Sequence, residues 1–110
     1  MPVETARKVE ALSHDFRSQR RLAEALDVSP AQVNRWIRGG GIDLANAERV
    51  DVLELVMSSL LRVYPAAVAE RWLFGLNPHL RERRPIDLVR RGAAQELLAA
   101  IAADRAGAFA

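Results

Sequence analysis

Residues 20–38 carry the pattern that most restricts the fold of this chain, because it specifies two short helices separated by a tight turn. The apolar positions recur at helical spacing on both sides of that turn: Leu22, Ala25, Leu26, Val33, Trp36 and Ile37. Asp27 lies in the turn, where its short polar side chain tolerates a left-handed backbone. Ser29 and Pro30 suit the cap and the first position of the second helix. The segment therefore predicts two helices packed along one apolar seam.

The spacing within this segment is typical of a helix-turn-helix. Ala23 is small where two helices must cross closely, and Val33 and Trp36 follow it ten and thirteen residues later. Asp27 stands where helix-turn-helix proteins usually carry glycine, so the turn departs from the common pattern at that position. The alternative is an ordinary helical hairpin, and the outward face of residues 30–38 favours the helix-turn-helix over it.

That outward face carries side chains that read base edges in the DNA major groove. Glutamine and asparagine pair with adenine, and arginine pairs with guanine. The candidates for DNA contact at this helix are Ser29, Gln32, Asn34, Arg35 and Arg38. The candidates for holding phosphates, which orient a module without reading sequence, are Arg17, Arg20 and Arg21. We therefore predict operator DNA as one partner.

Composition narrows the class of protein. The chain has 110 residues, half of them hydrophobic, which suits one compact domain or a small module with an appendage. Its formal net charge is only +2, so bulk charge gives weak support for nucleic-acid binding. It has no cysteine, which excludes disulfides, thiolate nucleophiles and cysteine-type zinc sites. No segment has the apolar length of a membrane span or a signal core, so we expect a cytoplasmic protein.

The whole chain is typical of a helical protein, because strand-type alternation is absent and strong helix formers dominate. We predict an all-α fold with helices over residues 4–16, 18–26, 30–38, 44–63, 65–74, 85–91 and 93–106, a short turn at 78–80 and a tail at 107–110. The broad apolar face of the 44–63 helix predicts that it bridges two modules or packs in a dimer. We place a helix-turn-helix module at residues 1–43 and a second helical module at residues 44–110.

No set of residues in the sequence forms a recognisable reaction centre. His14 and His79 are far apart and lack a ligand-spaced companion. The carboxylates at i, i+3 spacing in the 44–63 helix are typical of a charged helix surface. The glycines at 39–41 lack the lysine and the preceding strand of a phosphate-binding loop. We therefore predict no catalytic residue, no metal site and no cofactor, and we expect a protein that is not an enzyme.

A second informative stretch covers residues 69–92. It is dense in large apolar groups: Trp72, Leu73, Phe74, Leu76 and Leu80. From the residues alone, these groups pack in a core or form an exposed patch for a partner. The role of the arginines between Arg81 and Arg91 is also open, since they either pair with acidic groups on a partner or are exposed to solvent.

This stretch resembles the C-terminal domain of the Xre/MbcA/ParS antitoxins. The resemblance rests on Trp72-Leu73, Asn77-Pro78, Leu80, Pro85-Ile86-Asp87-Leu88 and the closing Gly107-Ala108-Phe109-Ala110. The helix-turn-helix that precedes it strengthens the match, and the two together cover most of the chain. Ala93-Ala94 depart from the family pattern, which usually has a second small or glycine residue in the turn after Gly92.

The resemblance implies a type II antitoxin with a toxin-binding function in residues 44–110. Its partner would be a RES-domain toxin that destroys NAD⁺, and the antitoxin itself would bind no NAD⁺. In the family, the C-terminal domain covers the toxin and its extreme C-terminus occludes the entrance to the active site. The toxin-binding residues implied are Trp72, Asn77, Pro78, Leu80, Arg84, Pro85, Asp87, Leu88, Gly107, Ala108, Phe109 and Ala110. The family also implies repression of its own operon and a homodimer within a larger toxin–antitoxin assembly.

Two other interpretations remain open at this point. One is a stand-alone helix-turn-helix transcriptional regulator whose C-terminal module serves only dimerisation. The other is a protein-interaction protein whose helix-turn-helix no longer binds DNA, which the low net charge allows. A RES-type gene next to this one favours the antitoxin, and a salt-dependent shift of promoter DNA excludes the protein-interaction alternative.

Overall fold

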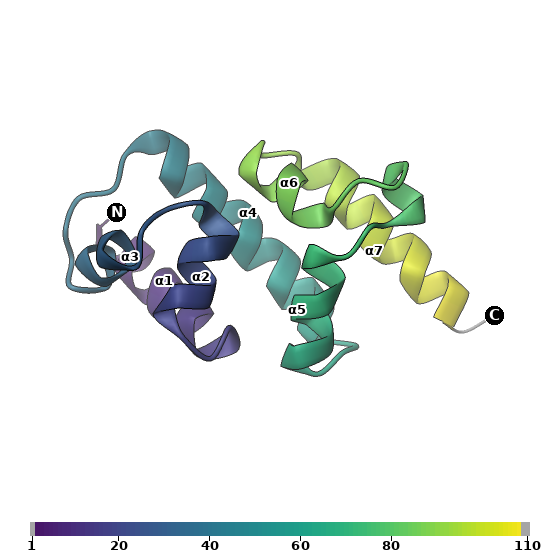
Figure 1. Ribbon diagram of the computed structural model, residues 1–110, viewed down its shortest axis with the longest axis horizontal. Coiled ribbons are helices and arrows are strands. Elements are labelled where there is room, and N and C mark those ends of the chain that lie inside the picture. The colour runs from purple at the N-terminus through teal and green to yellow at the C-terminus, as the bar shows by residue number, and fades with distance from the viewer. Residues whose placement is uncertain (1, 109–110) are drawn as a thin grey trace. The chain divides into compact units, whose positions relative to one another are not determined.

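The computed structural model describes the backbone of residues 2–108 and the side chains of residues 5–107, and every regular element in that range is helical (Figure 1). The elements are α1 (Pro2–Asp15), α2 (Gln19–Leu26), α3 (Pro30–Ile37), α4 (Leu44–Leu61), α5 (Ala66–Phe74), the 3-10 helix η1 (Pro78–Leu80), α6 (Pro85–Arg90) and α7 (Ala94–Ala108). The strand-like pairing within those residues is one antiparallel bridge between Asn77 and Arg83. The predicted all-α fold is confirmed.

The chain forms two compact units that meet within α4, one up to Glu54 and one from Leu55 onward. The predicted division into residues 1–43 and 44–110 puts all of α4 in the second module. In the structure, Val50 and Leu53 in the first part of α4 are buried within the N-terminal unit. The functional division at residue 43 stays a prediction.

The N-terminal unit is built around the seam that the 20–38 pattern predicts. Its fully buried large side chains include Leu12 of α1, Phe16 of the turn after α1, Leu22 and Leu26 of α2, and Trp36 of α3. Burying a side chain of this size contributes roughly 1.5–3 kcal/mol each. An ion pair of 2.9 Å between Lys8 Nζ and Asp51 Oδ1 joins α1 to the first part of α4.

The C-terminal unit has its own core, to which every one of its helices contributes. Its buried apolar residues are Val56, Met57, Leu60, Ala69, Leu73, Leu80, Ile86, Leu88, Val89, Leu97, Ala100 and Ile101. Proline at the first position starts both η1 and α6, and Gly92 ends the α6 region with a φ of +73°. Glycine adopts the left-handed backbone conformation without a steric cost, because it has no Cβ. Gly92 therefore allows the sharp turn into α7.

The helix ends differ from the sequence predictions at the C-terminus. α7 continues through Gly107 to Ala108, so these two residues are helical and not part of a tail. The positive-φ glycines of the described residues are Gly39 and Gly92, so Gly107 does not end the helix with a left-handed turn. Phe109 and Ala110 lie outside the described residues. Ile37, which was predicted to lie on the apolar seam, is only half-buried.

Candidate functional site

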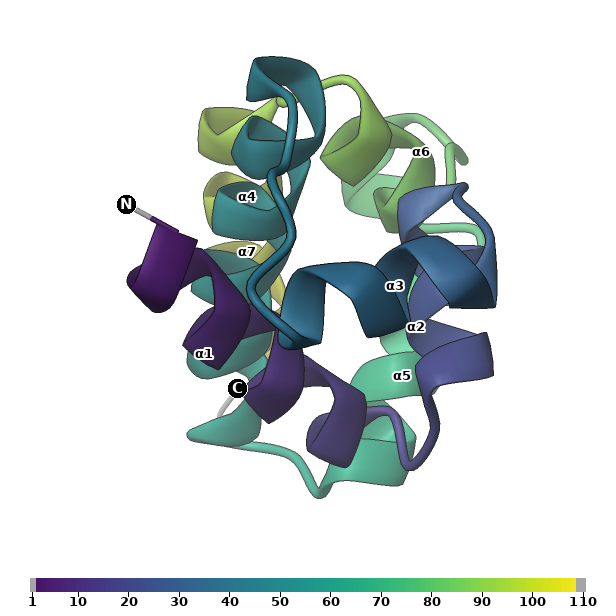
Figure 2. The same ribbon diagram turned by 90° about the vertical axis from the view of Figure 1, so that its left-hand side faces the viewer.

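The geometry of the turn between α2 and α3 matches its predicted cap chemistry. Ser18 caps α2, where its Oγ accepts from Arg21 N at 3.1 Å, and Ser29 caps α3 by accepting from Gln32 N at the same distance. Asp27 lies in the left-handed region at φ 58° and ψ 47°. These local contacts set the direction in which α3 leaves the turn. Figures 1 and 2 show α2 and α3 as consecutive helices joined by this short connection.

α3 presents a polar outer surface near its N-terminal end. A shallow hollow on this surface is lined by Ser29, Ala31, Gln32 and Arg35. Arg35 and Arg38 are exposed and Gln32 is half-buried, whereas Val33 and Trp36 point into the core. The α3 side chains best placed to reach a DNA groove are therefore Gln32, Arg35 and Arg38.

Asn34 has a different environment from the rest of that surface. Its side chain is half-buried, and its Nδ2 donates to Gln19 Oε1 at 3.2 Å. This bond joins α3 to the start of α2, so Asn34 helps to orient α3 relative to α2. The sequence did not point to Gln19, because the bond depends on how the two helices pack.

The three candidate phosphate-binding arginines gather at the N-terminal end of α2. Arg17 precedes the helix, and Arg20 and Arg21 lie in its first turn, with all three exposed. Arg17 has a φ of 66°, and its N–H donates to His14 O at 3.0 Å, which ends α1 sharply. Phosphates favour the N-terminal ends of helices, so these cations and the α2 dipole act in the same direction.

The start of α4 is capped by a carboxylate that stays charged. Asp43 accepts from the Asn46 backbone N–H at 3.2 Å and from its side chain at 2.7 Å. These two hydrogen bonds lower the pKa of Asp43 below its ordinary value, and the bond from the Asn46 side chain has the larger effect. Asp43 therefore remains ionised at neutral pH at the positive end of the α4 dipole.

Asp104 of α7 joins the residues that carry the family resemblance in the C-terminal unit. Its carboxylate accepts from Trp72 Nε1 of α5 and, at 3.5 Å, from Asn77 Nδ2, and it pairs with His79 Nε2 at 3.0 Å. Asn77 is buried, and its Oδ1 caps η1 by accepting from His79 N at 2.9 Å. We call these four residues the Asp104 cluster. Sequence reasoning missed Asp104, because its partners lie 27 and 32 residues away at Asn77 and Trp72.

The other predicted toxin-binding residues divide into buried and exposed groups. Leu80, Pro85 and Leu88 are buried in the core of the unit. In this conformation they support the residues at the surface and are not themselves open to a partner. Pro78 is exposed. Arg84 pairs with Asp87 at 3.1 Å, and the hydrogen bond from Arg84 to Asp87, with the attraction between their charges, raises the pKa of Arg84. Gly107 is exposed on α7, and Ala108 is helical.

Comparison with known proteins decides between a helical hairpin and a helix-turn-helix. A helix-turn-helix family model matches residues 17–51. The mycobacterial cidal antitoxin MbcA of Mycobacterium tuberculosis is 37% identical to this chain over 89 residues, which cover 80% of the chain and 79% of that protein. MbcA of Mycobacterium bovis matches to the same extent. The chain belongs to the MbcA antitoxin family.

The fold agrees with that of MbcA as solved in a complex. A crystal structure of the M. tuberculosis MbcT–MbcA toxin–antitoxin complex matches this chain with a TM-score of 0.77 and 33% identity, covering 96% of each chain. The resemblance inferred from the Trp72–Leu88 residues is thereby confirmed. The predicted contact residues themselves are not tested by this match and stay predictions.

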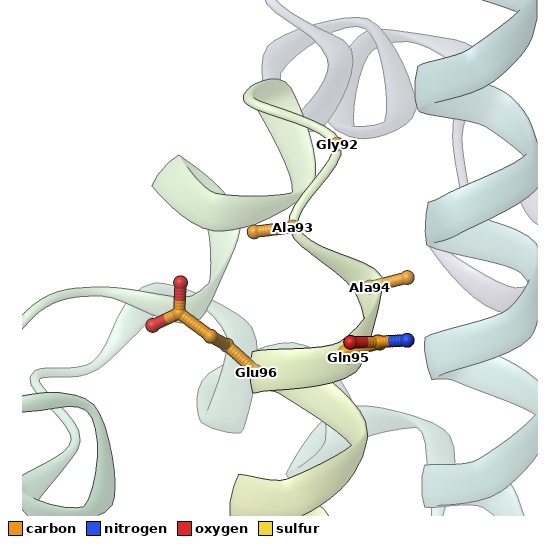
Figure 3. A pocket seen from close by; sticks show the side chains of 5 residues that line it. All are labelled: Gly92, Ala93, Ala94, Gln95 and Glu96. Carbon is orange, nitrogen blue, oxygen red and sulfur yellow. The ribbon is translucent and has the colours of Figure 1, made fainter.

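The turn between α6 and α7 contains Ala93 and Ala94. A shallow hollow there is lined by Gly92, Ala93, Ala94, Gln95 and Glu96 (Figure 3). Ala93 and Ala94 project in opposite directions, and Glu96 projects on the side of Ala93. Glu96 also pairs with Arg83 at 2.7 Å, which ties the start of α7 to the loop before α6. The small alanines leave the turn open without adding a reactive group.

Two features of the described residues concern metal ions and membranes. Among them, no group of three or more histidine, cysteine, aspartate or glutamate side chains is arranged to hold a metal ion. None of the helices between residues 2 and 108 has the length and apolar character to cross a membrane.

Proposed function

We propose that this chain is the antitoxin of a cytoplasmic type II toxin–antitoxin pair, and that it inactivates a RES-domain toxin that destroys NAD⁺. The observation that carries the proposal is the agreement with MbcA over nearly the whole chain, in a structure solved as a toxin–antitoxin complex. The chain acts by binding and takes no part in a reaction itself. The C-terminal unit covers the toxin, and the end of α7 with the residues after it blocks the entrance to the active site.

The helix-turn-helix gives the chain a second partner. The polar surface of α3 and the three arginines at α2 support binding to the operator of the chain's own operon. We propose that a homodimer within the toxin–antitoxin assembly places two such surfaces on a two-fold symmetric operator. Binding of the assembly then represses transcription of both genes.

Deletion of residues 107–110 tests the blocking role of the C-terminus. We expect the truncated chain to fail to restore growth to cells that express the toxin encoded beside it, because the entrance is left open. Operator binding in a gel-shift assay is expected to stay unchanged, since the helix-turn-helix is intact. Phe109→Ala keeps the chain length and removes the largest side chain of the deleted segment, so it should also weaken neutralisation. Full neutralisation by the truncated chain would rule out the blocking role.

Replacement of two α3 side chains tests the choice of reading surface. We expect Gln32→Ala and Arg35→Ala each to weaken operator binding by about 1–3 kcal/mol, which is roughly 5- to 150-fold. Binding to unrelated DNA should change much less. Arg62→Ala removes one exposed arginine outside the helix-turn-helix and controls for lost charge. Unchanged operator affinity in both α3 variants would show that another face reads the DNA.

A further inference from the structure

The loop between α5 and α6 contains two consecutive residues with an unfavourable backbone. Arg81 has a φ of 57° and Glu82 a φ of 61°, both in the left-handed region. Side chains with a Cβ adopt this region at a cost, and glycine adopts it freely. Such strain persists only where the surroundings enforce it, and it is concentrated at sites of function.

The surroundings do enforce this turn. Asn77 N donates to Arg83 O at 3.0 Å, and Leu80 N and Glu82 N each donate to Asn77 O at 2.9 Å. Arg83 Nε also donates to Leu80 O at 2.8 Å. The turn is therefore held rigidly before any partner arrives, and a rigid element loses little conformational freedom on binding.

The two strained side chains are also exposed and unpaired. Arg83, Arg84 and Arg90 all have carboxylate partners within the unit. Arg81 and Glu82 are exposed and make no ion pair or side-chain hydrogen bond with the described residues. Neither side chain thus contributes a polar contact that would explain why the turn lacks glycine.

The neighbouring side chains indicate a protein partner. Leu76, in the same loop, is 68% exposed, and Pro78 is exposed as well. Apolar groups beside an arginine are typical of the centre of a protein interface. The carboxylate of Glu82, next to Arg81, would repel the phosphates of DNA, so this surface suits a protein better than a nucleic acid. The surface fits a partner with an apolar patch and a pair of opposite charges.

We propose that the Arg81–Glu82 turn is a specificity element that binds a carboxylate and a neighbouring basic group on the toxin. This inference rests on the proposed antitoxin function and adds the residues that select the cognate toxin from related ones. A toxin whose two charges stand in the opposite order would be rejected, because each of its charges would then face a like charge.

The test measures affinity for the purified toxin encoded beside this chain, together with the melting temperature of the full chain. We expect Arg81→Gly and Glu82→Gly each to weaken binding at least about tenfold. The melting temperature should stay within about 5 °C of the original or rise, because glycine relieves the strain. The exchanged variant R81E/E82R keeps the net charge and should bind more weakly than either glycine variant.

Arg62→Ala is the matched control, because Arg62 is exposed in the same unit and lies outside the run of arginines from Arg81 to Arg91. Its binding should match the unchanged chain. Glycine variants that bind the toxin as tightly as the unchanged chain would overturn the inference alone. Weakened operator binding in place of weakened toxin binding would also overturn it, since the turn would then contact DNA. If the unchanged chain does not bind the toxin, the proposed function fails and this inference fails with it.

Discussion

Replacing Trp36 with alanine is expected to lower the free energy of unfolding of the N-terminal unit by about 3–5 kcal/mol. Trp36 is 1% exposed and is the largest side chain in that core, so its removal leaves a cavity between α3 and the helices it packs on. A loss of this size is a large fraction of the stability of a small domain. We expect operator binding to be lost and neutralisation of the toxin to be retained, because the C-terminal unit has a core of its own. Urea unfolding followed by circular dichroism measures the first effect.

Trp36→Phe is the control that separates packing from hydrogen bonding. Trp36 Nε1 is buried and has no hydrogen-bond partner among the described residues. Phenylalanine removes this unpaired donor, which offsets part of the cost of the smaller ring. We therefore expect Trp36→Phe to cost much less than Trp36→Ala and to keep operator binding. Equal losses in the two variants would show that the indole nitrogen has a partner in solution.

Replacing Asp104 with alanine is expected to destabilise the C-terminal unit by about 2–4 kcal/mol. The substitution removes the acceptor shared by Trp72, Asn77 and His79. Asn77 is only 5% exposed, so its freed N–H group cannot be fully hydrated, whereas the more exposed His79 can be. Trp72 fluorescence in a Trp36→Phe background follows the unfolding of this unit, and toxin affinity should fall as the end of α7 loosens.

Asp104→Asn is the matched variant for this prediction. It keeps an oxygen that accepts from Trp72 and loses the negative charge that faces His79. We expect a cost of about 1 kcal/mol, clearly smaller than that of the alanine variant. An alanine variant as stable as the original chain would show that the Asp104 cluster does not hold α7 to η1 and α5.

The features that the sequence predicted correctly depend on contacts between near neighbours. Ser29 caps the helix that follows it, and this cap joins residues three positions apart. Asp27 adopts the left-handed conformation for which its side chain is suited. The end of α7 is the exception among local features, because Gly107 was expected to stop a helix that continues through it.

The all-α fold and the helix-turn-helix could be predicted from the sequence alone, because helix caps, turns and apolar spacing act over a few residues. The antitoxin family was indicated by the resemblance of its motifs. Only the tertiary structure decided that Asp104 joins Trp72, Asn77 and His79, and that Asn34 bonds to Gln19. It also decided that Arg83 pairs with Glu96 of α7, and that Arg81 has no such partner among the described residues. These contacts depend on how helices distant in the chain pack, and no local spacing rule encodes that packing.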